Sequence, residues 1–159
     1  MAEGKFAGAY DLLFSHYLKS VRKKIMNIVK KYGCKNVIDL GCGTGEQCRM
    51  LFNEGMKVVG VDASLHMINY ARKVSSAGTK YLVSDILSLD TKKIFDCAIL
   101  SFVLHGNTME EQEKILEKAK EMTKNGIVII ADYGEAENMK EKGDKCYDDG
   151  VLFILWRSN

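Results

Sequence analysis

The chain of 159 residues is 47% apolar and 28% charged, as is typical of a globular domain with a buried core. This composition excludes a disordered, collagenous or disulfide-scaffold chain, and the length predicts a single domain. The formal net charge of +2 argues against nucleic acid as a partner, because phosphate binding requires a strongly basic face. We interpret the basic run at residues 22–24 as the solvated face of a helix.

Nothing in the sequence predicts a membrane span or a targeting signal. The longest uninterrupted apolar stretch, at residues 151–156, is far shorter than the roughly 20 residues that cross a bilayer. The first residues lack the basic-then-apolar pattern of a signal peptide. The five cysteines are odd in number and form no C-x-x-C pair, which favours neither disulfides nor a zinc site. We therefore expect a cytoplasmic protein without a bound metal.

The hydrophobic pattern predicts strands and helices in alternation. In chain order, we predict an amphipathic helix within residues 10–32, a strand at 36–40, a helix ending near residue 55, a strand at 57–62 and a helix from residue 64. Apolar strands at 80–84 and 95–101, a helix beginning at residue 108 and a strand at 126–131 follow. This alternation predicts an α/β fold, with a Rossmann-like, doubly wound, mostly parallel sheet, strands buried on both faces and helices on either side.

A last apolar run, at residues 151–156, follows a polar and highly charged segment. We predict it as an edge strand, so that the sheet holds about six strands and is abbreviated at its C-terminus. An exposed edge of this kind invites pairing with another chain. A homodimer that pairs through the C-terminal edge strand is therefore one assembly that the sequence leaves open.

A glycine-rich turn, Asp39-Leu-Gly41-Cys-Gly43-Thr-Gly45, leaves the first predicted strand. Such a turn lets a nucleotide-like ligand approach the backbone closely, next to the N-terminus of the following helix. A dinucleotide fingerprint would need a third glycine where Glu46 stands, and this carboxylate would repel a pyrophosphate. A P-loop is excluded because no Gly-Lys-Ser/Thr follows. The turn thus favours a ligand without phosphates.

The turn resembles the first motif of class I S-adenosylmethionine-dependent methyltransferases. Three further segments are similar to the family's motifs and follow in order: Val61-Asp62-Ala63-Ser64-x-x-Met67-Ile68, Val83-Ser-Asp85-Ile86, and residues 95–105, which include Ser101 and His105. The resemblance covers residues 10–133. The cofactor of this family carries a cationic amine and a sulfonium, so an acidic site is favourable for it.

The resemblance implies residues that bind S-adenosylmethionine and its product S-adenosylhomocysteine. Asp62, about 20 residues beyond the glycines, would accept the ribose hydroxyls, and Asp85 would receive the exocyclic amine of adenine. Tyr10 resembles the aromatic residue that closes over the cofactor in many small-molecule methyltransferases. The expected cofactor-binding residues are Tyr10, Asp39, Gly41, Cys42, Gly43, Gly45, Asp62, Ala63, Met67, Asp85, Ile86 and Ser101. The division that follows is a helical lid region (1–33), a cofactor-binding core (34–133) and a short C-terminal segment (134–159).

The implied function is transfer of a methyl group to a small-molecule acceptor by in-line displacement. The chain contains no proline, which excludes the Asn/Asp-Pro-Pro-aromatic loop and the Pro-Cys nucleophile of enzymes that methylate nucleobases. His105 is the candidate general base for an acceptor that must lose a proton, and a structural role for it is equally open. The short C-terminal segment motivates an alternative, a cofactor-binding module without catalytic activity. An NAD-dependent oxidoreductase is a third reading.

Overall fold

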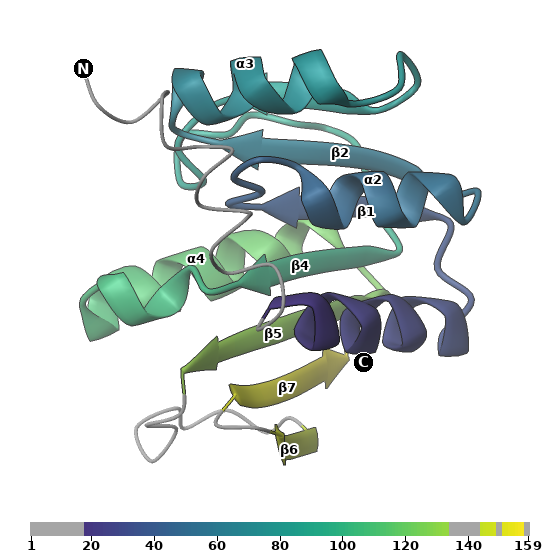
Figure 1. Ribbon diagram of the computed structural model, residues 1–159. Helices are drawn as coiled ribbons and strands as arrows, with labels where there is room; N and C mark the ends of the chain where they lie inside the picture. Colours follow the sequence, from purple (N-terminus) through teal and green to yellow (C-terminus); the bar gives the residue numbers. More distant parts are fainter. Residues whose placement is uncertain (1–17, 134–143, 149–150, 158–159) are drawn as a thin grey trace.

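One seven-stranded sheet organises the chain in the computed structural model, which describes residues 18–133, 144–148 and 151–157 (Figure 1). The sheet order is β3-β2-β1-β4-β5-β7-β6. The strands are β1 (Asn36–Leu40), β2 (Lys57–Asp62), β3 (Lys80–Val83), β4 (Cys97–Ser101), β5 (Ile127–Tyr133), β6 (Asp144–Asp148) and β7 (Val151–Arg157). The first five strands are parallel, and β7 runs antiparallel to both of its neighbours. The predicted α/β, Rossmann-like fold is confirmed.

Helices cover both faces of the sheet (Figure 1). They are a helix over residues 18–31, α2 (Glu46–Asn53), α3 (Leu65–Val74), the short 3-10 helix η1 (Leu104–Gly106) and α4 (Met109–Met122). The helix over 18–31 packs with α2 and α3 in one buried cluster, and α4 packs in the other. Side chains alternate between these clusters along the central strands β1, β4 and β5, because successive residues of a strand point to opposite faces. In β4, Ile99 belongs to the first cluster and Leu100 to the second.

Side chains cap two of the helix starts. The Ser64 hydroxyl accepts a hydrogen bond from the Met67 backbone N–H at 3.3 Å at the start of α3. A capping box opens α4: Thr108 accepts from the Glu111 N–H, and the Glu111 carboxylate accepts from the Thr108 N–H. Each cap satisfies backbone donors that have no partner inside the helix.

The prediction for the C-terminal segment is wrong in one respect. The run at residues 151–156 belongs to β7, which lies between β5 and β6 and is therefore not an edge strand. The strand that raises the number to seven is β6, whose polar sequence carries no hydrophobic alternation. The sheet is accordingly not shortened to a single strand after β5, and pairing of two chains through residues 151–156 loses its basis. The three-part division of the chain stays a prediction.

The prediction that the third strand is buried on both faces is also wrong. This strand forms the edge of the described sheet next to β2, and of its four residues only Tyr81 is buried. Leu82 and Val83 are 44% and 43% exposed. No helix among the described residues is long and apolar enough to cross a membrane.

Candidate functional site

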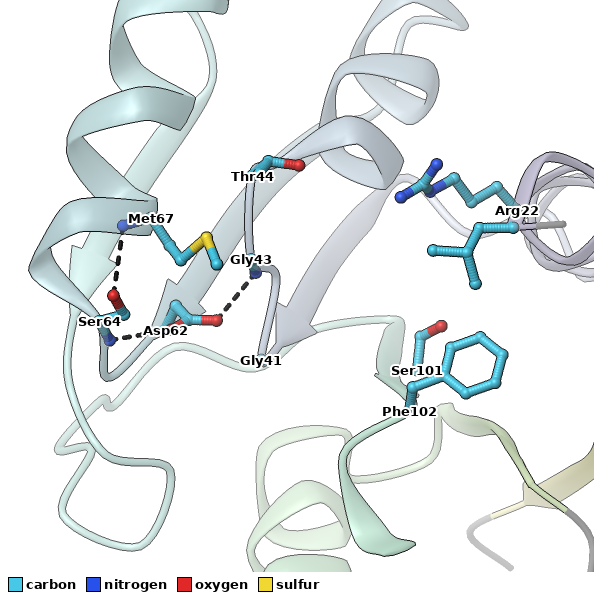
Figure 2. A pocket seen from close by; sticks show the side chains of 10 residues that line it. Arg22, Gly41, Gly43, Thr44, Asp62, Ser64, Met67, Ser101 and Phe102 are labelled. Atoms are coloured by element: carbon cyan, nitrogen blue, oxygen red, sulfur yellow. Dashed lines mark hydrogen bonds between the residues drawn. The ribbon is translucent and has the colours of Figure 1, made fainter. Parts of the chain in front are cut away.

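A cavity of about 470 Å³ opens at the carboxyl ends of the central strands. The strand order reverses between β1 and β4, and ligands of open α/β sheets bind outside the strand ends at such a switch point. Figure 2 shows side chains from the β1 and β2 loops, the end of β4 and the helix over 18–31 around this space. The lining residues are Leu18, Arg22, Gly41, Gly43, Thr44, Asp62, Ser64, Met67, Ser101 and Phe102.

The glycines after β1 are required by the backbone. Gly41, Gly43 and Gly45 have φ angles of +81°, +54° and +78°, in the left-handed region that favours glycine. A Cβ at Gly41 would meet Val103 Cγ2 at 2.5 Å, and one at Gly45 would collide with the Tyr81 hydroxyl. A Cβ at Gly43 would meet no atom within 4 Å. Gly43 therefore leaves open space in the cavity wall, where a ligand can approach the backbone.

The Asp62 carboxylate is fixed at the end of β2 by two backbone donors. Gly43 N–H donates to Asp62 Oδ2 at 2.8 Å, and Ser64 N–H donates to Oδ1 at 2.9 Å (Figure 2). These bonds tie the glycine loop to the β2–α3 turn. Each carboxylate oxygen has a further lone pair, so Asp62 still has acceptor capacity on the cavity side.

A smaller cavity of about 260 Å³ continues the site beyond Gly41 and Asp62, which line both spaces. Its walls include Ala63, Asp85 and Ile86 from the loops after β2 and β3. The two cavities together form an elongated site, with Gly41 and Asp62 at its centre.

Asp39 lies behind the glycine loop, 2% exposed, and lines neither of these two cavities. Burial, with a smaller contribution from the nearby charge of Asp62, raises its pKa to about 7. A weak hydrogen bond from Cys48 Sγ at 3.5 Å and the charge of Arg22 act in the opposite direction. A carboxylate with so few donors is close to the balance between its neutral and ionised forms near pH 7.

An aromatic and histidine cluster borders the cavity beyond Phe102. The Phe102 ring lies 4.8 Å from that of Tyr133, and the Tyr133 ring lies 5.1 Å from the His105 imidazole. Phe102 itself has a positive φ of 56°, a conformation that is uncommon for a non-glycine residue and tends to occur at functional sites.

The buried carboxylate of Asp132, at the end of β5, fixes this cluster. It accepts hydrogen bonds from the backbone N–H groups of Leu104 and Tyr133, both at 2.8 Å, and from that of His105 at 3.3 Å. His105 Nδ1 lies 2.8 Å from Asp132 Oδ1. Because a carboxylate only accepts, Nδ1 carries the proton, and in the neutral ring Nε2 is left as an acceptor.

Most of the residues expected from the sequence come together around these two cavities. Eight of the expected residues line them directly, namely Gly41, Gly43, Asp62, Ala63, Met67, Asp85, Ile86 and Ser101. Gly45 is the N-cap of α2, and Cys42 packs against the core beside the sheet. His105 does not line either cavity, and Tyr10 lies outside the described residues.

Five residues that line the larger cavity are absent from the expected set: Leu18, Arg22, Thr44, Ser64 and Phe102. For Arg22 the interpretation as part of a solvated face is wrong, since its half-buried side chain reaches from the helix over 18–31 toward the cavity (Figure 2). It is the one cation among the described residues that line the larger cavity. The helical spacing could have linked two of these residues, because Leu18 and Arg22 are four residues apart and therefore share one flank of the helix.

The sequence from residue 32 to residue 151 matches the methyltransferase domain family. The chain belongs to this family. This methyltransferase domain is 27% identical over 124 residues to an uncharacterized methyltransferase of Bacillus cytotoxicus, an alignment that covers 77% of the chain and 56% of that protein. It is 43% identical over 155 residues to the glycine N-methyltransferase of Mus musculus, covering 81% of the chain and 52% of the relative. The chain thus spans about half the length of these curated relatives.

Solved methyltransferases share the fold of this methyltransferase domain. The N-methyltransferase NodS of Bradyrhizobium japonicum, in complex with S-adenosyl-L-homocysteine, superposes with a TM-score of 0.73 at 14% identity, covering 88% of this chain and 86% of NodS. Magnesium protoporphyrin IX methyltransferase of Synechocystis, with bound S-adenosylmethionine, gives 0.70 at 17% identity, covering 91% and 79%.

Proposed function

We propose that this methyltransferase domain binds S-adenosylmethionine and transfers its methyl group to a small-molecule acceptor. The observation that carries the proposal is the pairing of Gly43 and Asp62. An open left-handed glycine and a carboxylate held by backbone donors stand side by side at the switch point of the sheet. The volume of about 470 Å³ suits a small ligand, and small-molecule methyltransferases are among the relatives and structural neighbours.

The residues present fit the chemistry of this cofactor. Asp62 would accept the ribose hydroxyls at the centre of the elongated site, and Asp85 and Ile86 in the smaller cavity would hold the adenine ring. Arg22, in the larger cavity, would bind the cofactor's carboxylate through a charge-assisted hydrogen bond. The glycine loop would bring the backbone against the ligand at Gly43. Each polar side chain in this assignment, those of Arg22, Asp62 and Asp85, already lines one of the two cavities.

The bound cofactor supplies an already activated methyl group, so the protein's main task is alignment and exclusion of water. Ser101 and Phe102 lie at the end of the larger cavity away from Asp62, where an acceptor would enter (Figure 2). For an acceptor that must lose a proton, His105 is the proposed base, with Asp132 fixing its tautomer. Its role stays a prediction, because the imidazole is separated from the cavity by Tyr133 and Phe102.

Removal of the Arg22 charge tests the placement of the amino-acid end of the cofactor. We expect Arg22→Gln to weaken S-adenosylhomocysteine about tenfold, the range for one charge-assisted hydrogen bond. Affinity for 5′-methylthioadenosine, which lacks the carboxylate, should not change. Lys23→Gln is the matched control, because Lys23 is exposed on the same helix. Calorimetric titration of the three proteins measures both ligands, and an equal loss for both would contradict the assignment.

The proposed function itself is tested by two measurements on the purified chain. Calorimetry with S-adenosylmethionine and S-adenosylhomocysteine should show binding, and mass spectrometry of a metabolite mixture incubated with the labelled cofactor should show a methylated product. Binding without any turnover would instead support a cofactor-binding module. Binding of NAD but not of either methionine derivative would overturn the proposal.

A further inference from the structure

A second large cavity, of about 540 Å³, lies at the amino ends of the strands, whereas the proposed cofactor site lies at their carboxyl ends. Asn36, Lys57 and Lys80, the first residues of β1, β2 and β3, all border it. No residue that lines it lines either of the cavities around Gly41 and Asp62. The proposed methyl transfer therefore leaves this cavity without a role.

The charge around this cavity is of one sign. Lys57, Lys80 and Lys93 all line it, and no Asp or Glu does. The three side chains form no ion pair with any described residue. Three unpaired ammonium groups at one concave surface repel one another and raise the local concentration of anions. The neighbouring Asp96 carboxylate accepts hydrogen bonds from the backbone N–H groups of Lys35 and Asn36, at 2.7 and 2.8 Å. Asp90 lines a smaller adjoining cavity together with Lys80 and Lys93.

The walls between the lysines are apolar. Phe52, from the end of α2, and Val59, from β2, form part of the surface, and Ile94 lines it with 52% of its area exposed. A Cβ at Gly78 would meet the Phe52 ring at 2.5 Å, so the glycine makes room for the ring at the cavity wall. The neighbouring cavity, of about 160 Å³, shares Val59 and extends the apolar surface.

We propose that this cavity is a second ligand site, for an organic anion with an apolar body. The anionic group is held among Lys57, Lys80 and Lys93, and the apolar body contacts Phe52, Val59 and Ile94. The cavity combines apolar walls with a few polar groups, and its volume is in the usual range of small-molecule sites. Carboxylates and phosphate esters share the required chemistry, and the experiment distinguishes them.

The probe is the fluorescent dye 8-anilinonaphthalene-1-sulfonate, which joins an anionic group to an aromatic body. In the presence of saturating S-adenosylhomocysteine, we expect saturable binding of one dye per chain. The triple variant Lys57→Gln/Lys80→Gln/Lys93→Gln should weaken the dye at least tenfold, and Ile94→Ser about threefold. The matched control, Lys23→Gln/Lys73→Gln/Lys124→Gln, removes the same charge from exposed positions elsewhere and should stay within twofold of the wild type.

Competition identifies the anion. Displacement of the dye by phenyl phosphate alone assigns the site to phosphate esters, and displacement by benzoate alone assigns it to carboxylates. The proposal is overturned by equal losses in the two triple variants, by the absence of saturable dye binding when S-adenosylhomocysteine is saturating, or by failure of both competitors. The single variant Lys80→Gln tests the same loss of dye affinity with a smaller perturbation of the fold. Circular dichroism checks that this variant is folded.

Discussion

Gly43→Asn is expected to weaken S-adenosylmethionine at least 100-fold, which corresponds to about 3 kcal/mol of binding free energy. Asparagine tolerates the left-handed backbone better than most residues, so the substitution changes the cavity more than the fold. No atom lies within 4 Å of the Cβ position, and Gly43 lines the larger cavity. The new side chain would therefore occupy space that the cofactor needs, beside the N–H that now donates to Asp62.

Gly33 offers a matched control for this prediction. Its φ is +67°, a Cβ there also meets nothing within 4 Å, and it lies after the helix over 18–31, away from both cavities around Asp62. Gly33→Asn should lower the melting temperature about as much as Gly43→Asn but leave the affinity unchanged. Calorimetric titration and thermal unfolding separate the two effects. Equal affinities in both variants would show that Gly43 does not border the cofactor.

The central part of the fold was predictable because its strands are buried by helices on both sides. Segments such as Asn36–Leu40 and Cys97–Ser101 are almost entirely buried, so their apolar residues are visible as short continuous runs. The glycine turn was predictable for a different reason, since left-handed backbone and close approach leave few alternatives to glycine. Both signals are local, and a single sequence contains them.

Features that depend on tertiary position could not be predicted from the sequence. The sequence of β6, Asp144-Lys-Cys-Tyr-Asp148, has no apolar alternation, and its pairing with β7 is made by the backbone. The helix over 18–31 shows its buried stripe through Val21, Ile25 and Val29, but only packing against the sheet reveals which flank faces the site. Arg22 lies on that flank. Asp132 could not be distinguished from an ordinary strand-end acid, because its donors Leu104 and His105 are 28 and 27 residues away.

Asp39 should make the stability of the protein decrease as pH rises toward 7. Its pKa is about 7 in the folded chain and about 3.9 in an unfolded one. Between these values the folded state holds a proton that the unfolded state has released, so folding becomes less favourable with rising pH. Above pH 7 both states are ionised and the loss is complete. Relative to Asp39→Asn, the wild type should lose about 2 kcal/mol between pH 5.5 and pH 8.

Urea unfolding of both proteins at the two pH values measures this difference, and the comparison cancels other titrating groups. Asp90→Asn, the same substitution at an exposed position, is the control. A pH-independent difference between the wild type and Asp39→Asn would contradict the raised pKa. The groups that set this pKa come from three elements, with Cys48 on α2, Asp62 on β2 and Arg22 on the helix over 18–31.

The ionised carboxylate of Asp39 lowers the stability of the folded chain at neutral pH, which suggests that its charge has a role in ligand binding. If the proposed cofactor brings a cationic amine and sulfonium next to the glycine loop, the ionised form of Asp39 becomes more favourable and its pKa falls on binding. The affinity for S-adenosylmethionine should then rise with pH, by at most tenfold per unit between pH 6 and pH 7, and level off above pH 7. Asp39→Asn should remove this dependence and weaken binding most at pH 8, although it is the more stable protein there. A variant that gains stability at pH 8 and keeps the full pH dependence of binding would show that Asp39 has no electrostatic part in holding the cofactor.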